Sequence, residues 1–258
     1  MSIKQIAIEL RNVSIKYADS EVVSKVSCKI MKGSFVGLVG PNGAGKSTII
    51  KAILGLVPVA SGKILLFDQP HDKLGNKRLL GYLPQKISGT NPLFPATVAE
   101  IVLLGLVASK SFPKLITKND RLKVAALLNE LKIKHLQSRI FSELSGGQQQ
   151  KVILARTLIA DPEILIFDEP STALDPNSRE AFFQIIRKLN QEKGKTIILT
   201  THDTGYIGEV ADQLMYLDRK LIYYGSFQEF CRSAEMGKRF GEYDQHLICH
   251  QHLDHEYN

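Results

Sequence analysis

A glycine-rich segment carries the strongest chemical pattern in this sequence of 258 residues. The pattern G-x-x-x-x-G-K-[ST] is typical of a loop whose backbone N–H groups surround a polyphosphate. In such a loop Lys46 neutralises the β- and γ-phosphate oxygens, and Ser47 offers a hydroxyl to Mg²⁺. An ordinary glycine turn has no need of a Lys-Ser pair at this spacing. We therefore predict nucleotide binding by Gly40, Pro41, Asn42, Gly43, Ala44, Gly45, Lys46, Ser47 and Thr48.

Two carboxylates, Asp168 and Glu169, directly follow the apolar segment Ile164–Phe167. Asp168 and Glu169 would lie at the carboxyl edge of a sheet, where ligands of open α/β folds bind. Asp168 could hold Mg²⁺, directly or through water, and Glu169 could orient or deprotonate a water for attack on the γ-phosphate. Alone, such a pair could equally be turn residues or a helix cap. Together with the phosphate loop, the pair indicates an active site.

The elements that would position these residues alternate between strands and helices. Strands are predicted at 35–39, 64–67, 164–167 and 195–200, and helices at 46–56, from the capping pair Thr117 and Asp120 through 131, from 147 to about 160, and from Pro176. Such alternation favours parallel strand pairing. The stretch 6–17, whose alternation changes phase after Leu10, and the hairpin-like stretch 214–224 favour antiparallel pairing. The predicted fold class is α/β.

Composition limits the function classes. The chain has 33 Lys and Arg against 26 Asp and Glu, which gives a net charge of +7, and 44% hydrophobic residues. It is not a disordered chain. The apolar stretch Ala52–Ala60 is too short for the roughly 20 residues that span a bilayer, and we expect no signal peptide. The three cysteines are widely spaced, so we expect no disulfide framework. The basic residues form no long run of the kind that binds nucleic acid nonspecifically.

A third motif, Leu144-Ser145-Gly146-Gly147-Gln148, lies before Asp168. With it, the chain resembles the nucleotide-binding subunit of an ABC transporter. The resemblance implies an ATPase with a P-loop NTPase core and a mostly parallel sheet, an N-terminal antiparallel β subdomain and an inserted α-helical subdomain. It also implies that this signature motif binds the γ-phosphate of ATP held by a second copy, and hence a homodimer with two ATP molecules and Mg²⁺. Ser145 offers a hydroxyl, and Gly146 and Gly147 expose amides at a helix start.

The resemblance assigns four further residues. Tyr17 would stack on adenine, although a strand tyrosine often only packs. Gln85 would reach Mg²⁺ or the attacking water, and His202 would contact the γ-phosphate; together with Glu169 and Lys46 they make up the predicted catalytic set. Asp175 would communicate across the dimer, or cap a helix, or both. The predicted ATP-binding domain covers 1–230, with its helical subdomain at about 86–160.

The stretch Asn91–Gly105 is similar to metal-chelate and zinc/manganese/iron importer families. This implies uptake of zinc or manganese through a separate permease at the cytoplasmic face of the membrane, with an external substrate-binding protein and no nucleic acid. Leu93, Phe94 and Val98 could line a groove for the permease, or be ordinary core. Alternatives for the function are another importer substrate, such as a metal chelate or an iron complex, and a soluble ABC ATPase outside transport.

The C-terminal tail, 231–258, is rich in metal-ligand side chains. Such residues suit Zn²⁺, Cu or Ni²⁺, although their spacing fits no fixed structural zinc motif. The alternative is a disordered polar tail that binds metal adventitiously. The candidate ligands are His246, Cys249, His250, His252 and His255.

Overall fold

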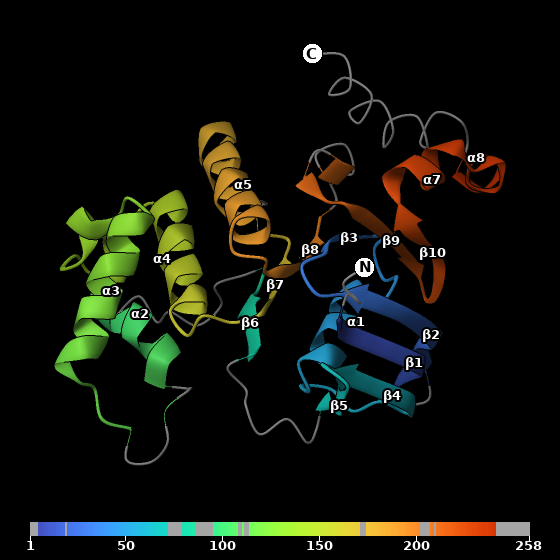
Figure 1. Ribbon diagram of the computed structural model, residues 1–258, viewed down its shortest axis with the longest axis horizontal. Coiled ribbons are helices and arrows are strands. Elements are labelled where there is room, and N and C mark those ends of the chain that lie inside the picture. Colours follow the sequence, from blue (N-terminus) through green and yellow to red (C-terminus); the bar gives the residue numbers. More distant parts are fainter. Residues whose placement is uncertain are drawn as a thin grey trace. The chain divides into compact units, whose positions relative to one another are not determined.

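The computed structural model describes residues 5–18, 20–71, 79–85, 95–107, 110, 114–170, 174–201, 207–208 and 210–240 (Figure 1). The chain divides into two units, and each is described by itself. The first unit comprises Met1–Gly75 and Asn190–Asn258, and the second comprises Asn76–Leu189. No helix in the described part of the chain combines the length and apolar character needed to cross a membrane.

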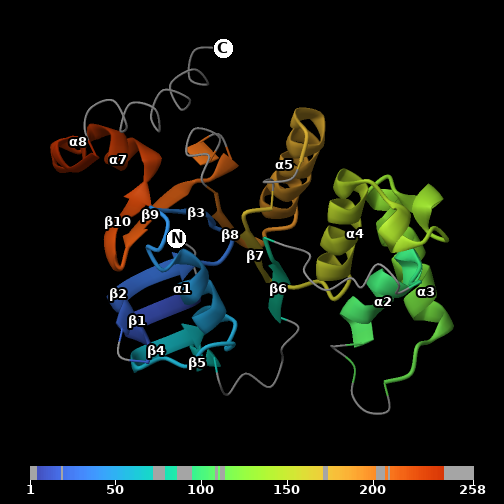
Figure 2. The same cartoon turned by 180° about the vertical axis from the view of Figure 1, so that it is seen from behind.

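The first unit contains an antiparallel sheet with the strand order β2-β1-β4-β5. Its strands, drawn in blue and teal in Figures 1 and 2, are β1 (Ile6–Tyr17), β2 (Ser20–Met31), β4 (Ser61–Leu66) and β5 (Gln69–Pro70). The pairing of β1 with β2 shifts register between Leu10 and Val13. The side chains of Leu10 and Val13 are both buried, although they lie an odd number of positions apart in the strand. The bulge between them adds a residue, so that Val13 again points into the core. The predicted antiparallel region and its change of phase are confirmed.

The first unit also contains a mostly parallel set of strands with the order β10-β9-β3-β8. These are β3 (Phe35–Val39), β8 (Thr196–Thr200), β9 (Gln213–Asp218) and β10 (Lys220–Ser226). β3 pairs in parallel with β8 and β9, whereas β9 and β10 form the predicted antiparallel hairpin. Every residue of β3 and β8 is buried, as expected for parallel strands. Helices α7 (Phe227–Arg232) and α8 (Ala234–Phe240) follow β10.

Helix α1 (Lys46–Ile53) follows the glycine loop and ends earlier than the predicted position 56. Gly55 has a φ of 70°. Its N–H donates to the Ala52 carbonyl, and the N–H of Leu56 donates to the Lys51 carbonyl. These two bonds and the left-handed glycine form a Schellman motif, which ends a helix.

The second unit pairs β6 (Leu80–Leu83) in parallel with β7 (Ile164–Asp168). Its helices are α2 (Val98–Val107), α3 (Lys118–Glu130), α4 (Gly146–Leu158) and α5 (Pro176–Gln191). Thr117 and Asp120 form the predicted capping box of α3. Lys110 donates to Asp120 at 2.7 Å and holds the pKa of that carboxyl well below its usual range. The cap of α3 predicted from the sequence is therefore confirmed.

Close packing shapes the interior of the second unit. A Cβ at Gly105 of α2 would lie 2.1 Å from the Arg156 carbonyl oxygen of α4, so only glycine permits this approach. Phe167 of β7 meets Phe182 of α5 edge to face, with ring centroids 5.8 Å apart. The first contact holds α2 close to α4, and the second packs α5 against the strand that leads to the two carboxylates.

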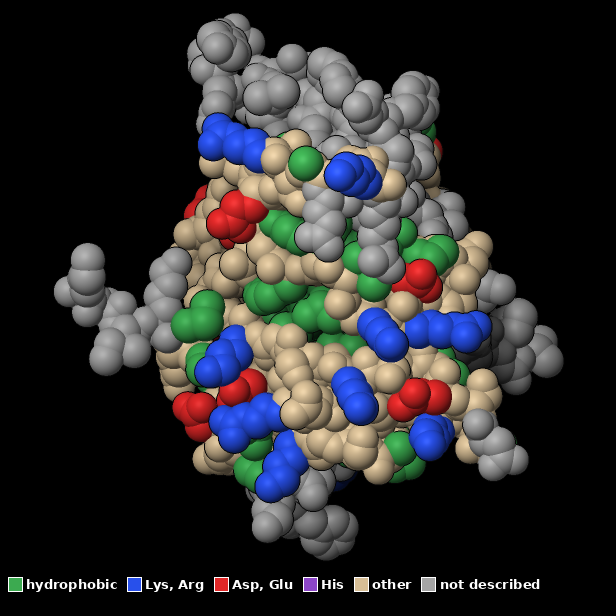
Figure 3. All heavy atoms as spheres, turned by 90° about the vertical axis from the view of Figure 1, so that its right-hand side faces the viewer, with side chains coloured by type: hydrophobic (Ala, Val, Ile, Leu, Met, Phe, Trp, Pro, Cys, Tyr) green, Lys and Arg blue, Asp and Glu red, His purple; other side chains and the backbone are tan. Residues whose placement is uncertain are grey.

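Charged side chains of both signs mix on the first unit's antiparallel sheet. The carboxylate of Glu9 accepts from Arg11 at 2.7 Å and lies 3.5 Å from the Lys29 ammonium. On the face drawn in Figure 3, Lys and Arg side chains are likewise interspersed with Asp and Glu. Part of the positive charge is therefore locally compensated.

Candidate active site

The phosphate loop lies between β3 and α1 in the first unit, with Lys46 as the first helical residue. The Lys46 side chain is almost fully buried, and its ammonium donates to the Gly40 carbonyl at 2.7 Å and the Pro41 carbonyl at 3.0 Å. The ammonium is thus held inside the loop, where phosphate oxygens could replace these carbonyls as acceptors. The helix N-terminus adds partial positive charge at the same place.

Two glycines of the loop are required by geometry. Gly40 has a φ of 149°, and a Cβ there would lie 2.0 Å from the Leu217 carbonyl oxygen. Gly45 has a φ of 94°, and a Cβ there would lie 2.7 Å from Val23. Side chains at either position would push the loop off the strands that support it.

A contact that sequence reasoning missed also supports the loop. The backbone N–H of Arg219, in the turn between β9 and β10, donates to the Ala44 carbonyl at 2.9 Å. The N–H of Ser24 donates to the Arg219 carbonyl at 2.7 Å. Backbone bonds between such distant residues leave no local pattern, so no signal in the sequence could reveal them.

The two predicted carboxylates end β7 in the second unit. Asp168 is the last residue of β7 and is almost fully buried, and Tyr82 of β6 donates to it at 3.4 Å. Gln85 follows β6, and its amide donates to the Glu169 carboxylate. Since β6 and β7 are parallel, their carboxyl ends meet at one edge. The structure therefore brings Gln85, Asp168 and Glu169 together.

The signature motif forms the beginning of α4. Ser145 caps the helix: its hydroxyl accepts from the Gln148 N–H at 3.4 Å, and the Gln148 side chain accepts from the Ser145 N–H at 3.1 Å. Because the hydroxyl accepts in this capping box, its proton can still donate to an anion. Ser145 and Gly146 are exposed, while Leu144 is buried beneath them. A Cβ at Gly147 would lie 2.9 Å from the Ser178 hydroxyl of α5.

Similarity to known proteins decides the family. A sequence profile described as "ABC transporter" matches residues 23–172. The zinc uptake system ATP-binding protein ZurA of Listeria innocua is 35% identical over 223 residues, which are 86% of this chain and 87% of that protein. The chain belongs to the ABC transporter family. The family and the ATPase activity expected from the motifs are confirmed.

Two further relatives of this ABC chain match it over most of its length. The manganese transport system ATP-binding protein MntB of Bacillus subtilis is 34% identical over 234 residues, which are 91% of this chain and 92% of that protein. A bacterial ABC transporter cassette, solved as a dimer, has a TM-score of 0.74 at 29% identity, over 85% of this chain and 98% of that chain. The predicted α/β P-loop fold with an antiparallel β subdomain and a helical subdomain is confirmed.

The structure describes the surroundings of two residues of this ABC ATPase that were assigned by resemblance, Tyr17 and Asp175. Tyr17, at the end of β1, is 46% exposed, so its ring is accessible for stacking. Asp175 accepts from the Ser178 N–H at 3.0 Å, and hydrogen bonds from Ser178 lower its pKa. The helix-capping geometry considered for Asp175 is therefore observed. Adenine stacking and communication across a dimer stay predictions.

Other predicted residues lie outside the described part of the chain. His202, Leu93, Phe94 and the five tail ligands belong to this group. Within the described part, no three His, Cys, Asp or Glu side chains gather to hold a metal ion. The phosphate loop and the carboxylates lie in different units, so their joint action on one nucleotide stays a prediction.

Of the two alternatives left open for Val98, the structure shows core packing. Its exposed fraction is 0%, so it does not line a groove; it packs in the core of the second unit.

Proposed function

We propose that this ABC ATPase powers the uptake of a divalent transition metal, zinc or manganese, through a separate permease. One observation carries the proposal: the zinc and manganese transport relatives match at 35% and 34% identity over nearly the whole chain. The resemblance of the stretch 91–105 to metal importers supports the same cargo.

ATP hydrolysis is proposed to use residues from both units. Lys46 neutralises the β- and γ-phosphates, and Glu169 takes a proton from the attacking water while Gln85 orients that water. Ser47, Asp168 and Gln85 offer a hydroxyl, a carboxylate and an amide oxygen, the hard oxygen donors that Mg²⁺ prefers, so these residues fit that ion. When bound, Mg²⁺ offsets the negative charge of the phosphates.

Tyr82 is expected to orient the Asp168 carboxylate in this reaction by donating a hydrogen bond to it. Burial, followed by the Asp168 charge, raises the pKa of Tyr82 to about 12, so the hydroxyl keeps its proton and donates at neutral pH. We expect Tyr82→Phe to raise the Mg²⁺ concentration for half-maximal ATP turnover about threefold to tenfold, because Asp168 loses a donor that orients it. Turnover titrated with Mg²⁺ measures this effect.

The matched control for Tyr82→Phe is Tyr223→Phe. Tyr223 donates its hydroxyl to the Ser226 carbonyl at 2.7 Å, in the hairpin of the first unit. This control should leave the Mg²⁺ dependence unchanged. An unchanged Mg²⁺ dependence in Tyr82→Phe would contradict the role given to Tyr82.

The active form is proposed to be a homodimer in the ATP-bound state. The signature motif presents an exposed anion site on α4: the Ser145 hydroxyl and the amides of Gly146 and Gly147. A γ-phosphate held by the loop of a second copy suits this site. The dimeric cassette with a similar fold supports this assembly.

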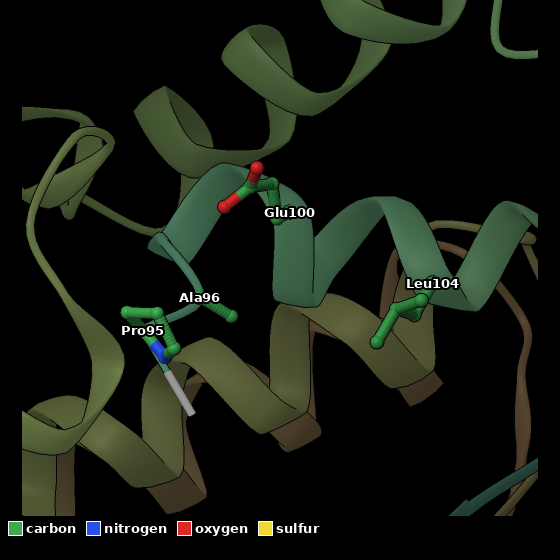
Figure 4. A pocket seen from close by; sticks show the side chains of 4 residues that line it. All are labelled: Pro95, Ala96, Glu100 and Leu104. Carbon is green, nitrogen blue, oxygen red and sulfur yellow. The ribbon is translucent and has the colours of Figure 1, made fainter. Parts of the chain in front are cut away.

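A permease segment is proposed to dock on α2, at the cytoplasmic face of the membrane. A pocket of about 290 Å³ lies beside α2 and is lined by Pro95, Ala96, Glu100 and Leu104 (Figure 4). Leu104 is 51% exposed and lines this pocket together with Pro95 and Ala96, so the three side chains offer apolar surface to a partner. This pocket replaces Val98 as the candidate docking surface. An external substrate-binding protein would deliver the metal to the permease.

The cargo is tested by cellular metal content. Deleting the gene should lower zinc or manganese, measured by mass spectrometry of cells grown under limitation of each metal. The intact gene should restore the metal, whereas a gene carrying Glu169→Gln should not, because import requires hydrolysis. Unchanged zinc and manganese in the deletion strain would contradict the proposal, and a loss of iron alone would favour the iron-complex alternative.

A further inference from the structure

Three successive glutamines follow the two glycines that begin helix α4, and their side chains make three different contacts. Gln148 completes the capping box with Ser145. Gln149 donates to the Phe141 carbonyl at 3.2 Å, in the segment just before the helix. Gln150 instead reaches forward in the chain and donates to the Pro170 carbonyl at 2.5 Å. Only this third glutamine joins the signature helix to the turn that follows β7.

That turn holds Glu169 in an unfavourable backbone conformation. Glu169 has a φ of 49°, which costs a residue with a side chain about 1–2 kcal/mol. The next residue is proline, and a residue before proline prefers an extended backbone with negative φ. A conformation disfavoured on both counts persists only where surrounding contacts impose it.

The contacts around the turn show what imposes this conformation. On one side, Phe167 and Asp168 are buried within β7, which fixes the strand leading into the turn. On the other side, the Gln150 amide holds the Pro170 carbonyl directly after Glu169. Glu169 therefore lies between two fixed points, one on the strand and one on α4.

We propose that Gln150 is a positioning residue for Glu169: it holds the Pro170 carbonyl and so keeps the catalytic carboxylate aligned with the signature helix. Gln150 lies five residues after Ser145 on one helix, about 7.5 Å along its axis at 1.5 Å per residue. A displacement of the Ser145 end is thus carried to the Glu169 turn through a rigid element. Phosphate binding at Ser145 and the orientation of Glu169 become linked within one chain.

This inference concerns the hydrolytic step and holds for any cargo. It rests on the proposed role of Glu169. It also requires that the bond from Gln150 to the Pro170 carbonyl orient Glu169, and not merely stabilise the folded protein. The deciding variant is therefore Gln150→Glu, which keeps the size of the side chain and removes the donor. A carboxylate would also repel the Pro170 carbonyl.

The experiment compares steady-state ATP turnover of the purified full chain and its variants at saturating Mg²⁺. Gln150→Glu should lower kcat about tenfold, while KM for ATP and the affinity for a fluorescent ATP analogue stay within twofold. Gln150→Lys, which retains a donor, should recover most of kcat. Gln149→Glu is the matched control: the same substitution at the neighbouring position also breaks a bond to a backbone carbonyl, yet it should leave kcat unchanged.

Three kinetic results would overturn the inference: unchanged kcat in Gln150→Glu, an equal loss of kcat in Gln149→Glu, or a loss confined to KM. Melting temperatures of the two Glu variants should agree within about two degrees, and a much lower value for Gln150→Glu would assign the bond a structural role instead. Glu169→Gln, measured in parallel, separates the hypotheses. Full turnover in that variant removes the role of Glu169, whereas lost turnover beside an active Gln150→Glu removes only the role of Gln150.

Discussion

ATP turnover should fall about 100-fold or more in Glu169→Gln, while ATP binding persists. Gln85 donates to the Glu169 carboxylate, and a glutamine at 169 can still accept that bond through its amide oxygen. The turn after β7 therefore keeps its contacts, and the substitution removes only the ability to take a proton from water. Steady-state phosphate release and the affinity for a fluorescent ATP analogue measure the two effects separately.

The matched control for Glu169→Gln is Glu143→Gln. Glu143 is exposed and lies in the short 3₁₀ helix Phe141–Glu143 of the same unit, so the same chemical change there should leave turnover unchanged. Full turnover in Glu169→Gln would remove the general-base role. Loss of both turnover and binding would instead assign Glu169 to nucleotide binding.

Features that depend on neighbours in the chain were predictable from the sequence. The capping box of Thr117 and Asp120 needs only residues three positions apart, and the structure shows it. The bulge between Leu10 and Val13 was predictable because the alternation of apolar residues in the sequence changes phase there. The phosphate loop and the signature motif likewise consist of consecutive residues, so their local shapes follow from residue types and spacing.

Features that depend on tertiary packing were not predictable. The bonds from Tyr82 to Asp168 and from Gln150 to Pro170 join residues 86 and 20 positions apart. Neither partner carries a pattern that would identify the other.

Val98 shows why an apolar run in the sequence does not indicate which of its residues are exposed. Helix α2 reads VAEIVLLGLV, in which apolar residues occur on every side. No polar stripe marks the outward face, so periodicity could not separate core from surface. The structure buries Val98 and exposes Leu104, six residues later in the same helix.

The affinity for ATP should fall about 10-fold to 100-fold in Lys46→Met, which keeps most of the side-chain length and removes the charge. The ammonium makes charge-assisted bonds to the Gly40 and Pro41 carbonyls, and it is the cation that the loop offers to the phosphates. Its loss removes the phosphate contact and leaves two loop carbonyls without this donor. Titration with a fluorescent ATP analogue measures the affinity.

The control for Lys46→Met is Lys51→Met in the last turn of the same helix, where the side chain is exposed. Both variants lower the net charge by one, so a long-range electrostatic effect on ATP would weaken binding in both. Only Lys46→Met should also lower the melting temperature, because only Lys46 bridges the loop carbonyls. Equal losses of affinity in the two variants would show that general positive charge, and not the geometry of the loop, attracts the nucleotide.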